Sequence, residues 1–475
     1  MLRLGEQTLR RGYARRLAEN LLVKNVRDAL ISSGIGGRVH YKFTRVYVEV
    51  NSSKSEDAQR VLSRVFGVSS FSPVIEVGFQ SLEDLAEKVV KIAAGKVKGK
   101  SFAVRPRRAG YHPFTSLDMA KVIGEQLLKY GSRVDLKNPE VEVNVEVRGW
   151  NAYIFYEKIP GAGGLPIGVE SPALALVSGG FDSAVAAWYV LRRGVPVHYV
   201  FFNLGGDPHF YGMLSVVKVL ADDWSYGYSP KLYEVDFRDV VRMLIRSVEE
   251  PYWNIVLKRM MYRAAERIAL TVGAEALVTG ENIGQVSSQT VTALKVASTG
   301  VKLPIFRPLL GFDKNEIIKM SMKIGTYKYS EMIPEYCALV PKAPVARPTL
   351  EEVLEEERKL DLKLIDEIAS QPTVYSLREI SKPDLTREFI EIEEVPEDAV
   401  LVDIRSREDY EEWHIPNAIH IDDLKPEPGK KYVFYCTRGK SSRLVAAYYK
   451  WKGFESYSLK GGIQKLKPHE SIDND

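Results

Sequence analysis

The sequence predicts a multidomain α/β protein, and three observations support this. The length of 475 residues favours about three domains. Between about 170 and 330, short apolar strands alternate with helical segments, which predicts a doubly wound parallel sheet with its ligand site at the carboxyl ends of the strands. The regions on either side, 1–165 and 388–475, mix strands and helices in smaller α+β and α/β units.

The first 165 residues divide into two predicted α+β units. Residues 1–55 read as strand, helix, strand, strand, which fits a ferredoxin-like unit, and residues 56–165 form the second unit. The glycine-rich stretch 161–166 reads as a linker. The expected elements are helices over Tyr13–Leu30, Leu82–Ala94 and Leu117–Tyr130, strands over Val46–Val50 and Ser101–Arg105, and a half-exposed strand over Val141–Arg148.

Three further segments follow. Residues 166–350 contain the predicted parallel sheet, with strands at Val197–Phe202, Leu232–Phe237 and Glu275–Thr279. Residues 351–387 are expected to form an acidic helix, opened by a capping box at Thr349, and then a proline-marked linker. Residues 388–475 form the last α/β unit, with strands at Ala399–Ile404 and Lys431–Tyr435.

Charge is distributed unevenly along the chain. Residues 1–50 carry ten basic and four acidic residues, and the stretch from Lys88 to Arg108 has eight basic residues and no acidic one. Such a basic region predicts a surface that docks a polyanion, with a solvated charged face as the alternative.

Cysteine use and hydropathy bear on the compartment. The chain has two cysteines, Cys337 and Cys436, which excludes a disulfide scaffold, and it lacks the Cys-x-x-Cys pairs of structural zinc sites. No apolar run reaches the ~18 residues of a membrane span, and no hydrophobic signal core follows Met1. We therefore expect a cytoplasmic protein without a structural metal or a membrane partner.

A glycine-rich turn, Ser178-Gly179-Gly180-Phe181-Asp182-Ser183, separates a predicted buried strand from a predicted helix. This geometry directs free backbone N–H groups and the positive end of a helix dipole at an anion, and the two serines add hydroxyl donors. The turn lacks the Gly-Lys-Ser/Thr ending of a Walker loop. It therefore predicts a phosphate-binding loop of another kind, with an ordinary turn as the alternative.

Cys436 lies in a second loop, between the strand ending at Tyr435 and a helix expected to start near Ser442. The loop N–H groups, the helix N-terminus, Arg438 and Lys440 are expected to stabilise a thiolate or a persulfide on this cysteine. A Cys-x5-Arg phosphatase would have arginine at position 442, so phosphatase chemistry is not expected. An inert buried cysteine is the alternative.

Several stretches resemble known families. The turn at 178–183 resembles the PP-loop of ATP pyrophosphatases, which cleave ATP between its α and β phosphates. The stretches 102–108, 112–116 and 134–139 resemble the THUMP domain of RNA-modifying enzymes. Residues 401–405, 414–420 and 459–462 resemble rhodanese signatures around the Cys436 loop. The order ferredoxin-like unit, THUMP, PP-loop domain, rhodanese-like unit covers nearly the whole chain and is similar to that of the tRNA uridine 4-sulfurtransferases, the 4-thiouridine synthetase or ThiI family.

The resemblance implies an enzyme that uses ATP and Mg²⁺ to adenylate O4 of uridine 8 in tRNA, after which a persulfide sulfur displaces AMP. Asp182 is expected to hold Mg²⁺ or orient pyrophosphate, and Lys314 to neutralise charge that develops on the phosphates. The family often has His-Phe where this chain has Phe201-Phe202, so position 201 departs from it. The implied nucleotide-binding residues are Leu176, Val177, Ser178, Gly179, Gly180, Asp182, Ser183, Phe201, Phe202, Lys258, Gly280 and Gln289.

The basic cluster is the expected contact surface for tRNA. Arginines suit phosphate contacts, and the nearby aromatic residues Tyr111 and Phe114 suit stacking on bases. The candidate RNA-binding residues are Lys98, Lys100, Arg105, Arg107 and Arg108.

The sulfur chemistry is expected to use both cysteines. Cys436 would receive sulfur from a cysteine desulfurase as a persulfide, and the resemblance assigns Cys337 the role of resolving the reaction as a disulfide. Some relatives also pass sulfur to the thiazole of thiamine, through a thiamine-pathway sulfur-carrier protein. The sequence leaves that second use open, and it also leaves a homodimer open.

Two other functions stay open from the residues alone. A PP-loop AMP-forming ligase or amidating enzyme acting on tRNA, such as a lysidine-synthetase-like protein, would need no catalytic cysteine, and the Cys436 loop counts against it. A non-catalytic sulfur-carrier or RNA-binding protein would not need Asp182, Ser183 and Lys314.

Overall fold

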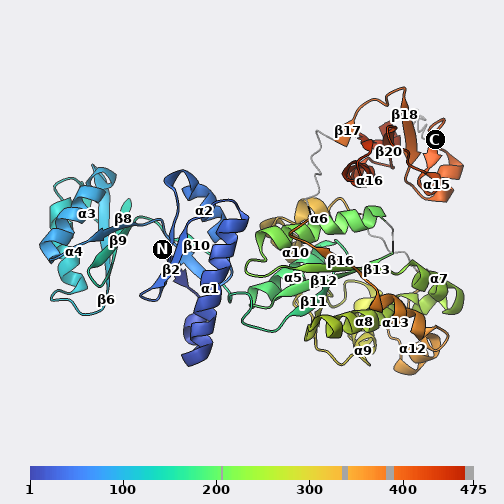
Figure 1. Ribbon diagram of the computed structural model, residues 1–475, viewed down its shortest axis with the longest axis horizontal. Helices are drawn as coiled ribbons and strands as arrows, with labels where there is room; N and C mark the ends of the chain where they lie inside the picture. The colour runs from blue at the N-terminus through green and yellow to red at the C-terminus, as the bar shows by residue number, and fades with distance from the viewer. Residues whose placement is uncertain (205–206, 334–340, 381–389, 466–475) are drawn as a thin grey trace, which may run out of the picture. The chain divides into compact units, whose positions relative to one another are not determined.

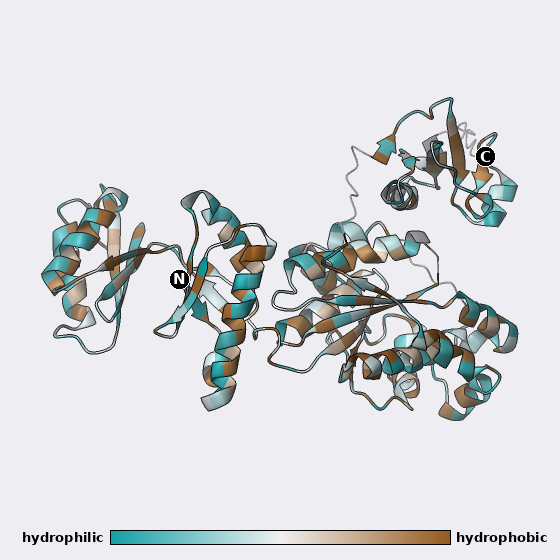
Figure 2. Cartoon of the chain, in the orientation of Figure 1, coloured by the Kyte–Doolittle hydropathy of each residue, from teal (hydrophilic) through white to brown (hydrophobic). Residues whose placement is uncertain are grey.

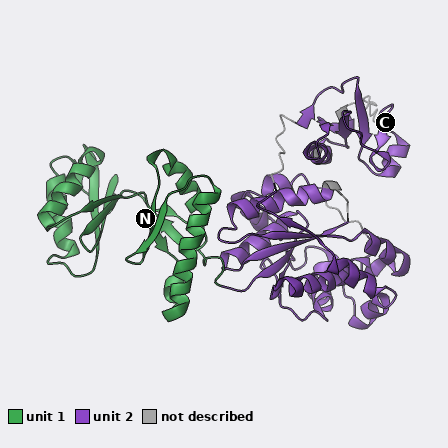
Figure 3. Cartoon of the chain, in the orientation of Figure 1, with its two compact units in different colours: residues 1–169 green, residues 170–475 purple. Residues whose placement is uncertain are grey.

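The computed structural model describes residues 1–204, 207–333, 341–380 and 390–465, which form four sheets flanked by helices (Figure 1). The chain divides into two compact units, residues 1–169 and residues 170–475 (Figure 3). Apolar residues concentrate on the strands and inner helix faces, and polar residues on the outer helix faces (Figure 2). This mixed architecture confirms the predicted fold class.

The first sheet of unit 1 is antiparallel, with the strand order β10-β4-β1-β3-β2. Its strands are β1 (Leu2–Leu4), β2 (Arg38–Lys42), β3 (Arg45–Glu49), β4 (Val68–Phe71) and β10 (Ile159–Pro160), and its helices are α1 (Gly12–Ser32) and α2 (Ser55–Leu62). The backbone N–H of Gly161 donates to Ser69 O, so the stretch 161–166, expected as a linker, begins by continuing this sheet. The predicted boundary at residue 55 stays a prediction; β4 lies beyond it and pairs with β1.

The second sheet of unit 1 has the order β5-β9-β8-β6-β7, and α3 and α4 pack on one of its faces. Its elements are β5 (Ile75–Gly78), α3 (Leu82–Val97), β6 (Ser101–Ala109), α4 (Ser116–Leu127), β7 (Arg133–Val134), β8 (Val141–Arg148) and β9 (Asn151–Phe155). The prediction of a half-exposed strand at β8 is wrong, because Asn144 and Glu146 on its other face are buried as well. Tyr153 and Phe155 of β9 pack against Met1 and Tyr47, so the first sheet covers that face.

The central sheet of unit 2 has the order β15-β14-β11-β12-β13-β16, and its strands from β15 to β13 are parallel. Helices cover both of its faces, as expected for a doubly wound sheet (Figure 1). The strands are β11 (Ala173–Leu176), β12 (Val197–Asn203), β13 (Lys231–Asp236), β14 (Ala276–Val278), β15 (Ile305–Phe306) and β16 (Thr373–Ser376). The helices are α5 (Phe181–Arg192), α6 (Asp207–Asp223), α7 (Arg238–Ser247), α8 (Trp253–Val272), α9 (Val291–Ser298), α10 (Lys314–Ile324), α11 (Tyr327–Ser330), α12 (Leu350–Glu357) and α13 (Leu362–Ser370).

The acidic segment after residue 349 packs on this domain. Val353 of α12 and Ile365 of α13 are fully buried in its core. Residues 373–376, which the sequence suggested as part of a linker, instead form β16, the one antiparallel strand, which covers the outer edge of β13. The hydroxyl of Tyr375 donates to Glu234 and holds this strand in place.

The last sheet is parallel, with the order β17-β21-β20-β18-β19. Its elements are β17 (Glu391–Ile392), β18 (Ala399–Asp403), α15 (Arg407–Glu412), β19 (Ile419–His420), β20 (Lys431–Tyr435), α16 (Lys440–Trp451) and β21 (Glu455–Leu459). Tyr211 of α6 is buried against Tyr448 and Trp451 of α16, with ring centroids 5.9 and 5.8 Å away. No helix in the described part of the chain is long and apolar enough to cross a bilayer.

Candidate active site

The turn between β11 and α5 is closed by its own hydrogen bonds. The buried hydroxyl of Ser183 donates to the carbonyl oxygen of Gly180 at 3.3 Å and accepts from the N–H of Ser178 at 3.4 Å. The helix α5 begins at Phe181, so its N-terminus and dipole face the turn. The Ser183 hydroxyl, expected as an anion donor, thus shapes the loop, while Ser178 remains exposed.

Two glycines are required by the packing around this turn. Gly179 has a φ of +83°, and a Cβ atom there would lie 2.6 Å from Cδ1 of Ile333. A Cβ atom on Gly280, which follows β14, would lie 2.6 Å from the backbone of Asp182. Gly280 therefore allows the loop after β14 to approach the turn, and Gly179 allows the turn to pack closely against Ile333 and α6.

Asp182 and Lys314 lie far apart in the sequence and meet at the N-terminus of α5. Lys314 Nζ donates to Asp182 Oδ2 at 2.6 Å. Lys314 is the first residue of α10, whose start is fixed by a capping box between Asp313 and Glu316. The structure therefore brings together the two charged residues that the sequence assigned to phosphate chemistry.

The second carboxylate oxygen of Asp182 has the environment of a metal ligand. Oδ1 is buried and has no hydrogen-bond partner among the described residues. A buried carboxylate oxygen without a partner, beside the glycine-rich turn, fits a hard cation such as Mg²⁺. Within the described ranges no group of three or more His, Cys, Asp or Glu side chains could hold a metal. A cation at Asp182 would therefore need phosphate oxygens or water as its other ligands.

Glu281 is a buried anion that joins two cations after β14. Its side chain accepts from Lys258 Nζ at 2.7 Å, Arg307 Nε at 2.6 Å and the hydroxyl of Thr279 at 3.0 Å. Burial by itself would raise the pKa of Glu281, but Lys258 and Arg307 outweigh it and hold this pKa below its ordinary value. Glu281 is therefore ionised at neutral pH and fixes both cations at the carboxyl edge of the sheet.

The loop after β14 also contains Gln289, which shapes it from within. Gln289 Oε1 accepts from the backbone N–H of Asn282 at 2.9 Å, and Lys258 Nζ donates to the carbonyl oxygen of Ser288 at 3.1 Å. Gly280 and Gln289 thus lie in the loop after β14, and Lys258 of α8 contacts that loop. Their assignment to nucleotide binding stays a prediction.

The two strand ends that were expected to bind the nucleotide lie side by side. Leu176 ends β11 and Val177 follows it, and Leu176 pairs with Val200 of β12. The ring of Phe201 packs edge-to-face on His209 at 4.8 Å, and that of Phe202 packs on Phe237 at 4.8 Å. Both phenylalanines are buried, which leaves their backbone groups, rather than their rings, for contact with a nucleotide.

Cys436 follows β20 in a tight loop that leads into α16. Its Sγ lies 3.5 Å from Ser442 Oγ, which in turn lies 2.8 Å from Ser458 Oγ on β21. The carbonyl oxygen of Cys436 accepts from the N–H of Ile463. The helix starts at Lys440, two residues before the expected start, so its N-terminus lies next to this loop. Cys436 is a buried free thiol in the described structure, and Arg438 is exposed.

Cys337 lies outside the described residues, so its role stays a prediction. Ile333 is the last described residue before it, and it lies beside Gly179 of the turn. Ile333 also packs against the core of the C-terminal sheet.

The candidate RNA-binding residues lie on and beside β6. Arg107 and Arg108 are exposed, while Arg105 pairs with Glu142 at 2.9 Å and donates to the carbonyl oxygen of Leu136. Lys98 and Lys100 are exposed in the turn before β6. Of the two aromatic residues expected to stack on bases, Tyr111 is exposed and Phe114 is buried in the core of the second sheet, so only Tyr111 is available.

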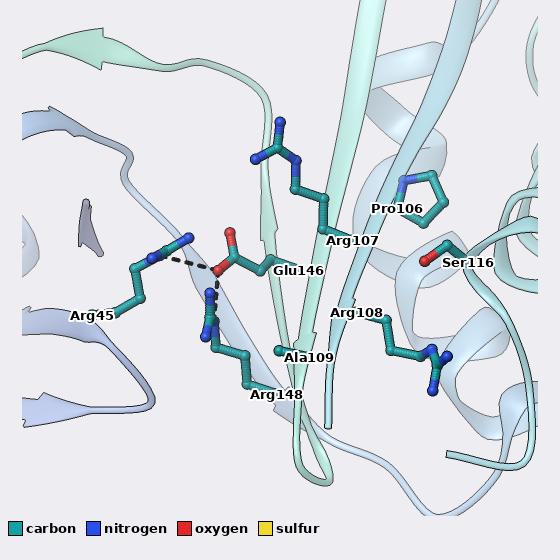
Figure 4. A pocket seen from close by; sticks show the side chains of 8 residues that line it. All are labelled: Arg45, Pro106, Arg107, Arg108, Ala109, Ser116, Glu146 and Arg148. Carbon is teal, nitrogen blue, oxygen red and sulfur yellow. Dashed lines mark hydrogen bonds and ion pairs between the residues drawn. The ribbon is translucent and has the colours of Figure 1, made fainter. Parts of the chain in front are cut away.

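Arg107 and Arg108 line a cavity of about 390 Å³ (Figure 4). Arg45 and Arg148 line it as well, and both contact the buried carboxylate of Glu146, at 3.1 and 2.6 Å. In Figure 4, Arg107 extends from its strand on the side of Glu146, whereas Arg108 points away from Glu146, on the side where Ser116 lies. Four arginines and one carboxylate line the cavity and give it an excess of positive charge that suits a phosphate group.

Sequence reasoning missed the partners that hold the candidate residues. Glu281 lies in a Thr-Gly-Glu stretch directly after a buried strand, which is the only local signal of its position. Arg307 and His209 carry no local signal that distinguishes them from structural residues. Their roles depend on contacts with residues 26 and 31 positions away.

Comparison with known families covers almost the whole chain. Residues 1–72 match the ThiI ferredoxin-like domain, residues 79–157 the THUMP domain, residues 168–362 the thiamine biosynthesis protein (ThiI) family, and residues 387–469 the rhodanese-like domain.

Relatives and solved structures agree with these matches. The chain is 42% identical to a tRNA sulfurtransferase of Pyrobaculum aerophilum, over 98% of both chains, and 35% identical to one of Thermoplasma acidophilum, over 96% and 94%. A crystal structure of a 4-thiouridine synthetase–RNA complex with bound ATP matches 79% of this chain and 98% of its own, with a TM-score of 0.70 and 30% identity. The chain therefore belongs to the family of the ThiI proteins and tRNA sulfurtransferases.

Proposed function

We propose that this chain is an ATP-dependent tRNA sulfurtransferase that forms 4-thiouridine. The contact between Asp182 and Lys314 at the glycine-rich turn carries this proposal, because a carboxylate that can hold Mg²⁺ and a cation that can neutralise phosphate charge lie together there. The relative that aligns with 98% of this chain is a tRNA sulfurtransferase, and the related 4-thiouridine synthetase structure contains RNA and ATP. The arginine-lined cavity and the exposed Arg107 and Arg108 support binding of tRNA by unit 1.

The first step joins AMP to O4 of uridine, which we place at position 8, and releases pyrophosphate. Asp182 would hold Mg²⁺, which neutralises pyrophosphate charge when bound. Lys314 donates to the phosphate oxygens as negative charge develops on them. The backbone N–H groups of the turn and the N-terminus of α5 add fixed donors that need no rearrangement.

The second step replaces oxygen by sulfur. A persulfide on Cys436, loaded by a cysteine desulfurase, attacks C4 of the adenylated uridine through its terminal sulfur, and AMP leaves. The thiolate of Cys337 then attacks Sγ of Cys436, which breaks the S–S bond, leaves sulfur on C4 and forms a disulfide between the two cysteines. An external dithiol reduces this disulfide, so the reaction belongs in the reducing cytoplasm.

Nucleoside mass spectrometry on unmodified tRNA tests this proposal. The full-length protein is incubated with tRNA, MgATP, cysteine and a cysteine desulfurase, and AMP is measured in parallel. We expect 4-thiouridine from the wild-type protein, and AMP without 4-thiouridine from Cys436→Ser. AMP with no thionucleoside from the wild type would contradict the proposal and favour an AMP-forming ligase; sulfur transfer to a thiamine precursor would then be assayed next.

A further inference from the structure

The first turns of α6 carry a buried histidine that contacts the glycine-rich turn. His209 is 5% exposed, and its Nε2 lies 3.1 Å from the carbonyl oxygen of Ser178. A carbonyl oxygen only accepts hydrogen bonds, so Nε2 carries the hydrogen and donates it. Burial lowers the pKa of His209 to about 4, against a smaller raising effect of this bond, so the ring is neutral at neutral pH.

The imidazole ring is held on its other side by the sheet. The ring of Phe201, on β12, lies at 80° to it with the centroids 4.8 Å apart. Phe201 is 1% exposed and therefore fixed in the core. The ring of His209 is thus packed against the sheet on one side and hydrogen-bonded to the turn on the other.

The hydrogen bond determines the direction of a neighbouring N–H group. The described backbone contains no cis peptide bond, and in a planar trans peptide the C=O of Ser178 and the N–H of Gly179 point in opposite directions. Because His209 holds the carbonyl toward α6, the N–H of Gly179 is directed away from α6. Gly179 has no side chain to restrict its backbone, so this peptide could rotate if the bond were absent.

We propose that His209 is a positioning residue of the turn, and that its hydrogen bond to Ser178 keeps the Gly179 N–H oriented for a phosphate of ATP. This inference rests on the proposed function of the turn as the ATP site. His209 itself touches the loop and not the nucleotide, so it acts through the backbone of Ser178 and Gly179.

Two substitutions separate the hydrogen bond from the packing. His209→Gln can place an amide N–H near the position of Nε2, whereas His209→Met fills a similar volume without a donor. Binding of MgATP to the full-length protein is measured by calorimetry. We expect about tenfold weaker binding for His209→Met, the effect of one lost hydrogen bond, and binding within about threefold of wild type for His209→Gln.

Hydrogen exchange provides a readout that does not depend on ATP. Without nucleotide, the amides of residues 178–183 should exchange faster in His209→Met than in His209→Gln, while the amides of β20 should be unchanged. Wild-type affinity of His209→Met, or equal losses in both variants, would overturn the inference. A wild-type protein that binds MgATP but forms no 4-thiouridine would overturn the proposed function instead, and the binding comparison would still decide the role of His209.

Discussion

Substitution of Glu281 by glutamine removes the charge that joins Lys258 to Arg307 and should destabilise the carboxyl edge of the central sheet. The side chains of Glu281, Lys258 and Arg307 are 7%, 17% and 14% exposed, respectively, so solvent screens their charges little. Removal of one partner from a buried ion pair costs about 3–5 kcal/mol, and the amide oxygen of glutamine keeps one acceptor, so we expect about 3 kcal/mol. That value corresponds to about a hundredfold change in a local opening equilibrium.

Hydrogen exchange by mass spectrometry on the full-length protein measures this loss where it occurs. The peptides from α8 and β14 should exchange about a hundredfold faster in Glu281→Gln than in wild type, because Lys258 lies on α8 and Glu281 follows β14. The matched control is Glu275→Gln, at an exposed position directly before β14. Exchange in Glu281→Gln that is within about twofold of this control would refute the reasoning.

The pH dependence of the same comparison follows from the lowered pKa of Glu281. A carboxyl group whose pKa is lower in the folded state contributes stability that is fully present above its unfolded value, near 4.5, and is lost as pH falls through the folded value. The difference between wild type and Glu281→Gln should therefore be constant from pH 8 to about 5 and shrink at more acidic pH. A difference that grows on acidification would contradict this assignment.

Two further predictions concern catalysis and RNA binding. Lys314→Met should slow AMP formation about a hundredfold in a single-turnover assay, because it removes a cation that would neutralise the developing phosphate charge. Lys319, which is exposed on the same helix, provides the control, and Lys319→Met should leave the rate unchanged. Equal effects of the two substitutions would contradict the role of Lys314. Arg107→Gln should weaken tRNA binding and lower the slope of log affinity against log salt concentration by about one, as measured by filter binding. Lys363→Gln, in unit 2, is the control. An unchanged slope for Arg107→Gln would place the phosphate contact elsewhere.

Much of the candidate site can be predicted from short stretches of sequence. The turn at 178–183 consists of consecutive residues between a buried strand and a helix, so its anion-binding geometry follows from local rules. The same holds for the loop of Cys436, whose flanking strand and helix were expected within two residues of their observed bounds. The alternation of short apolar strands with helical segments likewise indicated the parallel sheet of unit 2.

Other features needed neighbours that local patterns do not specify. Apolar and polar residues alternate along Val141–Arg148, as in a strand with one solvent-exposed face. Glu146 is nevertheless buried, because the first sheet of unit 1 packs against that face. Residues 373–376 follow a proline and resemble a linker, yet they pair with the free edge of β13. Phe114 looked suited to base stacking, and it is buried instead.

The sequence by itself determined the domain order, the glycine-rich turn at 178–183 and the cysteine loop, because each depends on residues that are adjacent in the chain. The tertiary structure alone decided that Lys314 meets Asp182, that Arg307 shares Glu281 with Lys258, and that His209 donates to the turn. These contacts form because parallel strands from distant parts of the chain end at the same edge of the sheet, and the order of those strands is set by packing of the whole domain.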